Sequence, residues 1–283
     1  MNSPKIAVMM HGQAGNTDKY GTGKAVDVEI SFRHFKERIL DVNPHVDIFM
    51  HSWSTDRRDK LADLYAPKLE YFEPQIIFDF EYIVGDPNGP GGEINCWHDG
   101  KFRGLDNLRF HSLFSRWYSA KMVNELRLMH QTQHGFEYDY VMLTRYDLAY
   151  VEDFDFTKFT NNQFYAIPPV SHHGIQDLWF IASNEDMNSL CEMYDWIKRI
   201  GHFPHKFTHS HWLTLNYLKL TGIDSRLQFF GSERPWEMGK EGAKLGPSPL
   251  VRDYYDVCEA TPDSDMGKVR NEIRKASKRK LTW

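Results

Sequence analysis

The chain has 283 residues, of which 41% are hydrophobic and 26% are charged. These proportions are typical of a globular protein and exclude a chain that is disordered throughout. Its 34 basic and 39 acidic residues give a formal net charge of −5, which argues against a protein built around non-specific contacts with nucleic-acid phosphates.

Short apolar runs alternate with amphipathic segments in the first part of the chain. We expect strands at residues 6–10, 46–50 and 69–72, and helices at residues 26–40 and 56–65. Strands that alternate with helices predict a parallel sheet with right-handed crossovers. The expected fold class is therefore α/β.

The later part of the chain continues this alternation. Residues 85–104 are rich in glycine and proline, so we expect no regular element there, but either a functional loop or lid or a plain insertion. The clearest strand of the chain is expected at residues 138–150. The other expected elements are helices at 107–131, 184–200 and 209–220, and strands at 163–167, 178–182 and 227–230.

Three cysteines, Cys96, Cys191 and Cys258, are too few and too scattered for a disulfide framework, and none belongs to a Cys-x-x-Cys pair. Free thiols are typical of a reducing compartment. The sequence shows no apolar run as long as a membrane span, so we expect no transmembrane segment. These features predict a cytoplasmic protein, or one in the host cytoplasm if its gene is viral.

Polar residues follow the first two expected strands directly. His11, Gly12 and Gln13 follow the first expected strand, and His51, Ser52 and Trp53 follow the second. In parallel α/β sheets, ligands bind beyond the carboxyl ends of the strands. We therefore expect these residues to line a ligand site.

The strand at residues 140–147 leads from an apolar run into Arg145 and Asp147. Residues two apart on a strand face the same way, so both side chains can point into one cleft. An aspartate there can hold a divalent cation, since Mg²⁺ and Mn²⁺ prefer oxygen ligands and bridge carboxylates to substrate phosphates. The alternative is a structural ion pair that caps the strand.

Four segments in one order carry a resemblance to a known family: 5–8 with 12–13, 46–53, 115–120 and 140–147. Together they resemble the glycosyltransferases of GT-A type fold found in bacterial polysaccharide clusters and in phages and large viruses. The resemblance covers residues 5–185 and implies one GT-A-like domain, with a Rossmann-like, mostly parallel central sheet flanked by helices. We divide it into a nucleotide-sugar-binding half (1–150), an acceptor-side half (151–263) and a basic C-terminal tail (264–283).

The resemblance also implies roles for individual residues. The acidic motif of the family usually reads Asp-x-Asp, whereas this chain has Arg145-x-Asp147. Asp147 is thus the one metal ligand carried over from that motif, for Mn²⁺ or Mg²⁺, and Arg145 can neutralise phosphate directly. Gly12 and Gln13 would lie against the nucleotide, with a UDP-sugar as the favoured donor, and Tyr118 would lie near the donor pocket.

Sugar transfer passes through an oxocarbenium-like state while a nucleoside diphosphate departs, so a cation or an arginine must stabilise the leaving group. If the configuration inverts, a carboxylate or histidine must take the acceptor proton. Asp177, at the head of the strand 177–182, is the best candidate, with a strand or turn cap as the alternative. Two histidine clusters remain, His172-His173 and His209-Ser210-His211. The resemblance implies that His211 is an additional metal ligand from the later part of the chain.

The acceptor is expected to be a glycan or lipid-linked glycan. The basic tail leaves open a second acceptor, since some phage enzymes of this kind glycosylate hydroxymethylated bases in DNA. Two other functions remain alternatives. One is a metal-dependent hydrolase that uses Asp147 and Asp177, and the other is an inactive nucleotide-sugar-binding protein, which Arg145 in place of the first aspartate would allow.

Overall fold

The computed structural model describes residues 3–15, 27–78, 81–85, 93–97, 104–148, 150, 153–167, 174–200, 202–203 and 210–229. Three features expected from the sequence lie outside these residues: the basic tail 264–283, the pair His172-His173, and His209. Within the described part of the chain, none of the helices is both long and apolar enough to cross a membrane.

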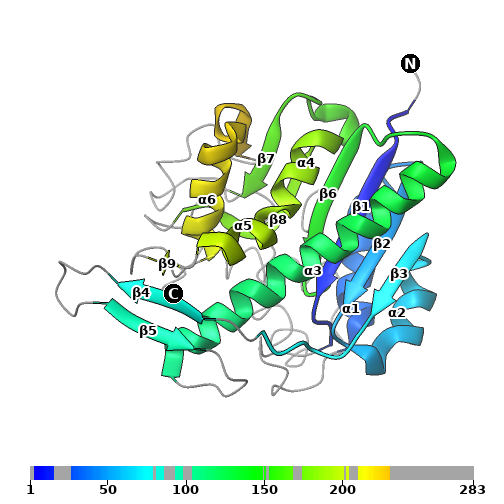
Figure 1. Cartoon of the computed structure of the whole chain (residues 1–283). Helices are drawn as coiled ribbons and strands as arrows, with labels where there is room; N and C mark the ends of the chain where they lie inside the picture. Colours follow the sequence, from blue (N-terminus) through cyan, green and yellow to red (C-terminus); the bar gives the residue numbers. More distant parts are fainter. Residues whose placement is uncertain are drawn as a thin grey trace, which may run out of the picture.

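The main sheet has seven strands in the order β10-β7-β8-β6-β1-β2-β3 (Figure 1). Strand β1 pairs in parallel with β2 and β6, β2 pairs in parallel with β3, and β8 runs antiparallel to β6 and β7. The strands are β1 (Ile6–Gly12), β2 (Val46–Ser52), β3 (Leu69–Phe72), β6 (Tyr140–Arg145), β7 (Phe164–Ile167), β8 (Gln176–Ala182) and β10 (Leu227–Phe229). The predicted α/β fold with a mostly parallel, helix-flanked sheet is confirmed.

Helices cover both faces of the sheet. The long helix α3 (Gly104–His134) crosses one face in front of β1 and β2 (Figure 1). Helices α1 (Val28–Phe35) and α2 (Arg58–Tyr65) pack on the other face through a separate apolar cluster. The remaining helices are α4 (Asn184–Cys191), α5 (Met193–Ile200), α6 (Ser210–Thr221), a π-helical turn at Lys36–Leu40 and 3-10 turns at Thr55–Arg57, Phe156–Lys158 and Ile223–Arg226.

The side chains of β1 alternate between the two apolar clusters. Ala7 and Met9 belong to the cluster under α3, whereas Ile6, Val8 and Met10 belong to the cluster that includes α1 and α2. All five are almost fully buried, which explains why the strand appears in the sequence as an unbroken apolar run. The next β1 side chain after Met9 on the face covered by α3 is that of His11, which is polar.

The expectation of an irregular segment at residues 85–104 is wrong in part. Strand β4 (Glu81–Gly85) pairs antiparallel with β5 (Glu93–Trp97), and β9 (His202–Phe203) joins β4 in a second, three-stranded sheet. Glycine and proline are concentrated between two strands, where turn-forming residues commonly separate the arms of a hairpin. The strand expected at 138–150 is also shorter, since β6 ends at Arg145.

Candidate functional site

A row of polar side chains ends the central strands on the face that α3 covers. One row earlier, Met9 is in register with Phe49 and Leu143, and all three are fully buried. Two residues further along β1, His11 is in register with His51 of β2 and Arg145 of β6. Since residues two apart on a strand share a face, the side chains of this second row lie under α3, at the carboxyl edge.

Helix α3 ties the ends of β1 and β2 together through Ser119. Its hydroxyl accepts a hydrogen bond from the Gly12 backbone N–H at 2.9 Å and lies 2.6 Å from Nδ1 of His51. The other ring nitrogen of His51 is 3.0 Å from Oε1 of Glu73. Burial lowers the pKa of His51, and Glu73 partly opposes this. Two residues expected to bind the donor, Gly12 and His51, are thus held by one serine.

Gly12 has a backbone φ of +98°, a conformation that favours glycine over residues with a Cβ atom. The Trp53 backbone N–H donates to the Gly12 carbonyl at 3.2 Å, which closes the gap between the ends of β1 and β2. Gln13 is half-buried at the start of the loop that follows. Ser52 is buried, and its hydroxyl accepts from the backbone N–H of Ser54, so its side chain supports the turn after β2.

Asp177 of β8 is 7% exposed and lies at the centre of a group of polar contacts. Nε of Arg116 is 3.0 Å from its Oδ2, and the guanidinium also donates to its backbone carbonyl. The Ser210 hydroxyl donates to Oδ2 at 2.5 Å, and Nε2 of His211 is 3.3 Å from Oδ1. Burial alone would raise the pKa of Asp177, but Arg116, His211 and Ser210 outweigh it and hold the pKa well below its usual range.

This arrangement keeps Asp177 ionised at neutral pH, with both carboxylate oxygens already in contact with donors. Burial on its own would lower the pKa of His211, but the carboxylate of Asp177 raises it. Asp177 and His211, expected to act as proton acceptor and metal ligand, are therefore direct neighbours. The first turn of α6 brings His211 to Asp177 rather than to Asp147.

Arg145 is the last residue of β6 and Asp147 lies in the turn after it, so the two are not neighbours on one strand face as expected, but their side chains are in contact. Nε of Arg145 donates to Oδ1 of Asp147 at 2.8 Å, and Nη2 lies 2.5 Å from Oδ2. Both carboxylate oxygens are thus engaged by one guanidinium, in the bidentate geometry typical of arginine and carboxylate. The structural ion pair left open by the sequence is present.

The metal ligands expected from the sequence do not form a cation site as they stand. Asp147 is occupied by Arg145, and His211 faces Asp177. Across the described ranges, no three His, Cys, Asp or Glu side chains are grouped so that they could hold a metal ion. Asp147 would have to leave Arg145 to bind Mn²⁺ or Mg²⁺, so the cation stays a prediction.

Aromatic side chains flank this edge on the β2 side. The rings of Trp53 and Tyr118 are stacked, with centroids 5.5 Å apart and planes inclined by 24°. Burial raises the pKa of Tyr118 well above its usual value, and the carboxylate of Glu73 adds to this. Tyr71 donates a hydrogen bond to the same carboxylate at 3.2 Å. The stack places two residues expected near the donor side by side.

The sequence assigned no role to Arg116, and it placed His11 at the ligand site only by its position at the end of the first strand. His11 is 2% exposed, and neither of its ring nitrogens has a hydrogen-bond partner among the described residues. Burial lowers its pKa well below the usual value, and Arg116 and Arg145 lower it further. The available signal was the alignment of polar residues at the ends of three adjacent strands, positions 11, 51 and 145.

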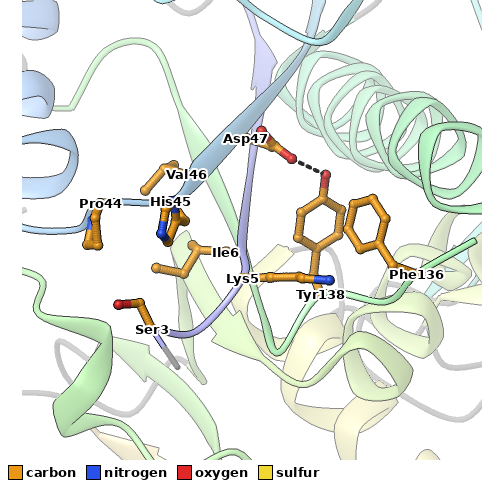
Figure 2. A pocket seen from close by; sticks show the side chains of 9 residues that line it. All are labelled: Ser3, Lys5, Ile6, Pro44, His45, Val46, Asp47, Phe136 and Tyr138. Atoms are coloured by element: carbon orange, nitrogen blue, oxygen red, sulfur yellow. Dashed lines mark hydrogen bonds between the residues drawn. The ribbon is translucent and has the colours of Figure 1, made fainter. Parts of the chain in front are cut away.

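A separate pocket of about 580 Å³ opens at the opposite, amino edge of the same strands. Figure 2 shows its lining, with the Tyr138 hydroxyl donating to Asp47 at 2.7 Å. None of the site residues expected from the sequence lines this pocket. Its walls are formed by Ser3, Lys5, Ile6, Pro44, His45, Val46, Asp47, Phe136 and Tyr138.

No family model matches this chain, and no curated protein matches it either. Among solved structures, it is similar to a cytidylyltransferase from Leptospira borgpetersenii, with 10% identity, coverage of 99% of both chains and a TM-score of 0.40. It is also similar to the glycosyltransferase GlyE of Streptococcus pneumoniae, with 10% identity and a TM-score of 0.41, over 98% of this chain but 64% of GlyE.

Proposed function

We propose that this chain is a glycosyltransferase that moves a sugar from a nucleotide-sugar donor to a hydroxyl group of an acceptor. The observation that carries the proposal is the buried Asp177, held ionised by Arg116 and His211 at the carboxyl edge of the sheet. Ligands of α/β sheets bind at this edge. Sugar transfer needs a proton acceptor beside cationic groups, and this edge supplies both.

Asp177 is the proposed proton acceptor for a reaction that inverts configuration. Its lowered pKa makes it a weak base toward a free hydroxyl. The acceptor oxygen becomes strongly acidic as its bond to the sugar forms, so a weak base suffices when proton transfer accompanies bond formation. The Ser210 and His211 side chains, both from the start of α6, orient the carboxylate for this role.

The donor is proposed to lie between Arg145 and the aromatic stack. The half-buried ring of Tyr118, held in place by its stack on the buried Trp53, suits a nucleobase or a sugar ring, since aromatic rings bury large apolar area at defined geometry. Arg145 supplies a guanidinium for the diphosphate. A UDP-sugar is the donor we would test first. Mn²⁺ or Mg²⁺ remains part of the proposal through Asp147, which would have to exchange Arg145 for the ion.

The test is a thermal-shift screen against UDP-, GDP-, ADP- and dTDP-sugars, each with EDTA and with Mn²⁺, followed by a measurement of nucleoside diphosphate release. A ligand that binds only the native state raises the unfolding midpoint. We expect one nucleotide class to do so and to be consumed. Asp177→Asn should abolish consumption, whereas Asp47→Asn at the opposite edge should leave it unchanged. If no nucleotide sugar shifts the midpoint, the proposal fails.

One observation favours a second candidate, a binding protein without activity. The bidentate pair of Arg145 and Asp147 occupies the position where the family has two acidic residues. An inactive protein would be stabilised by one nucleotide sugar, would release no diphosphate with glycan acceptors or with DNA containing hydroxymethylated bases, and would show the same affinity after Asp177→Asn. A metal-dependent hydrolase would instead cleave simple phosphate esters without any sugar acceptor.

A further inference from the structure

His11 of β1 differs in its hydrogen bonding from two other fully buried histidines, His34 of α1 and His51 of β2. Nδ1 of His34 is 3.0 Å from the carbonyl oxygen of Tyr150, and both ring nitrogens of His51 are within 3.0 Å of a side-chain oxygen. His11 is just as deeply buried, yet both of its nitrogens lack a partner within the described ranges. Burying a polar group without a hydrogen bond costs stability, so such a group calls for an explanation.

Charged groups of both signs act on His11: Arg116 and Arg145 lower its pKa, and the carboxylate of Asp177 raises it. Arg145 is its register partner on β6, and Arg116 on α3 is close enough to lower its pKa together with Arg145. The imidazole is therefore neutral at pH 7, with one N–H to donate and one lone pair. The Arg116 side chain is only 10% exposed, so its charge acts where water screens it poorly.

Both arginines are already arranged around carboxylates. Arg145 engages Asp147 with two parallel contacts, and Arg116 contacts Asp177. A guanidinium that binds a carboxylate in this way presents the same fork of donors to phosphate oxygens. Asp147 can thus be exchanged for an incoming phosphate without rebuilding the arginine.

We infer that His11, Arg116 and Arg145 form a binding site for the diphosphate group of the donor, in which the His11 N–H supplies the hydrogen bond missing from the protein alone. This inference rests on the proposed function. During transfer, the bond from the sugar C1 to the phosphate oxygen breaks and its electron pair stays on the diphosphate. The acceptor oxygen bonds to C1, and its proton passes to Asp177. The two guanidinium groups and the imidazole lie where the negative charge develops.

The test replaces His11 by leucine, which removes both nitrogens but keeps an apolar side chain of comparable bulk. The probes are inorganic pyrophosphate, UDP and uridine, each titrated calorimetrically in EDTA and again with Mn²⁺. We expect pyrophosphate and UDP to bind about tenfold more weakly, as for one lost hydrogen bond to a charged group, and uridine to bind unchanged. Without ligand, the unfolding midpoint of His11→Leu should equal or exceed that of the parent.

His34→Leu is the matched control, because His34 is equally buried but bonded to the Tyr150 carbonyl on the other face of the sheet. It should lower the midpoint and leave the affinity for pyrophosphate unchanged. His11→Gln should restore part of the affinity, since its amide can donate a hydrogen bond. It also serves as the variant to measure if the leucine variant does not fold.

The inference is wrong if His11→Leu lowers the midpoint as His34→Leu does and keeps full affinity for pyrophosphate and UDP. It is also wrong if pyrophosphate loses affinity but UDP does not, since the site would then take free phosphates rather than a nucleotide. Failure of the proposed function gives a different result. Pyrophosphate and UDP would bind through His11, yet no nucleotide sugar would be consumed.

Discussion

The two edges of the central strands differ in how their polar groups are satisfied. At the amino edge, Asp47 accepts from Tyr138 at 2.7 Å and lies 3.3 Å from Nζ of Lys68, while the ammonium of Lys5 lies 4.6 Å from the centre of the Phe136 ring (Figure 2). At the carboxyl edge, a buried imidazole has no hydrogen-bond partner in the described part of the chain. The charged side chains of the pocket in Figure 2, Lys5 and Asp47, both have partners, whereas both ring nitrogens of His11 at the carboxyl edge have none among the described residues.

The two edges also differ in burial. The side chains of Asp177 and Arg116 are 9% and 10% exposed, whereas those of Asp47 and Lys68 are 27% and 51% exposed. Charges withdrawn from water depend on their partners far more than charges at the surface. Equivalent substitutions at the two edges should therefore have unequal effects, which makes the comparison testable.

The largest effect is expected from Asp177→Asn, which keeps the side-chain volume but leaves the buried Arg116 without its counter-charge. We expect the free energy of unfolding to fall by about 3–5 kcal/mol. Asp47→Asn should cost about 0–1 kcal/mol, since its ion pair is partly exposed and the amide oxygen still accepts from Tyr138. Urea denaturation with an unchanged m-value measures both. Equal losses at the two edges would contradict the comparison.

A second prediction separates binding from stability. Arg145→Gln should weaken UDP binding about tenfold, since one charge-assisted contact to phosphate is lost. The ion pair with Asp147 is 32% and 22% exposed, so the loss in unfolding free energy should be only about 0–1 kcal/mol. Lys5→Gln at the amino edge should leave UDP binding unchanged and lower the free energy of unfolding by at most about 1 kcal/mol, since it removes the contact with the Phe136 ring. Calorimetric titration with UDP measures this effect. If Arg145→Gln binds UDP as tightly as the parent, Arg145 is not part of the donor site.

Much of the fold was predictable because it follows from local pattern. Buried parallel strands are continuous apolar runs, so β1 and β2 were expected within two residues of their bounds. The ion pair between Arg145 and Asp147 was one of the two alternatives expected, but strand periodicity does not explain it, since β6 ends at Arg145 and Asp147 lies in the turn that follows. Whether that pair also holds a metal is a question of chemistry that periodicity cannot answer.

The rest of the site depends on packing between distant segments. Arg116 contacts Asp177 because of the angle and the position at which α3 crosses the sheet. No local pattern in this 31-residue helix specifies either of them. The contacts of Ser210 and His211 with Asp177 likewise require α6 to dock beside β8. Strand β5 was missed because glycine and proline around it were taken to exclude regular structure.

The pH dependence of stability offers a third test. The pKa of His11 in the folded protein lies well below its unfolded value of about 6.5, so the unfolded chain binds more protons as the pH falls below that value. Stability should therefore decrease below about pH 6.5, by up to about 1.4 kcal/mol per pH unit for this one group. His11→Leu should remove that slope.

The variant isolates His11 because the other histidines are common to both proteins. His51 acts in the same direction, since burial lowers its pKa, and His211 acts in the opposite one, since Asp177 raises its pKa. Urea unfolding at pH 5, 6 and 7 gives the difference in slope between parent and variant. Parallel profiles would mean that His11 titrates in the folded protein as it does in the unfolded chain, so that burial does not lower its pKa.

The smallest effect is expected at the amino edge from Tyr138→Phe. This change removes the hydroxyl that donates to Asp47 and also contacts Nδ1 of His130, while the ring keeps its packing. The loss should be about 1 kcal/mol, as for an ordinary hydrogen bond, because Lys68 still faces Asp47. UDP affinity and transfer should not change. If Tyr138→Phe weakened UDP binding as Arg145→Gln is expected to, the pocket of Figure 2 would be a ligand site after all, and unsatisfied polar groups would be the wrong guide to function in this protein.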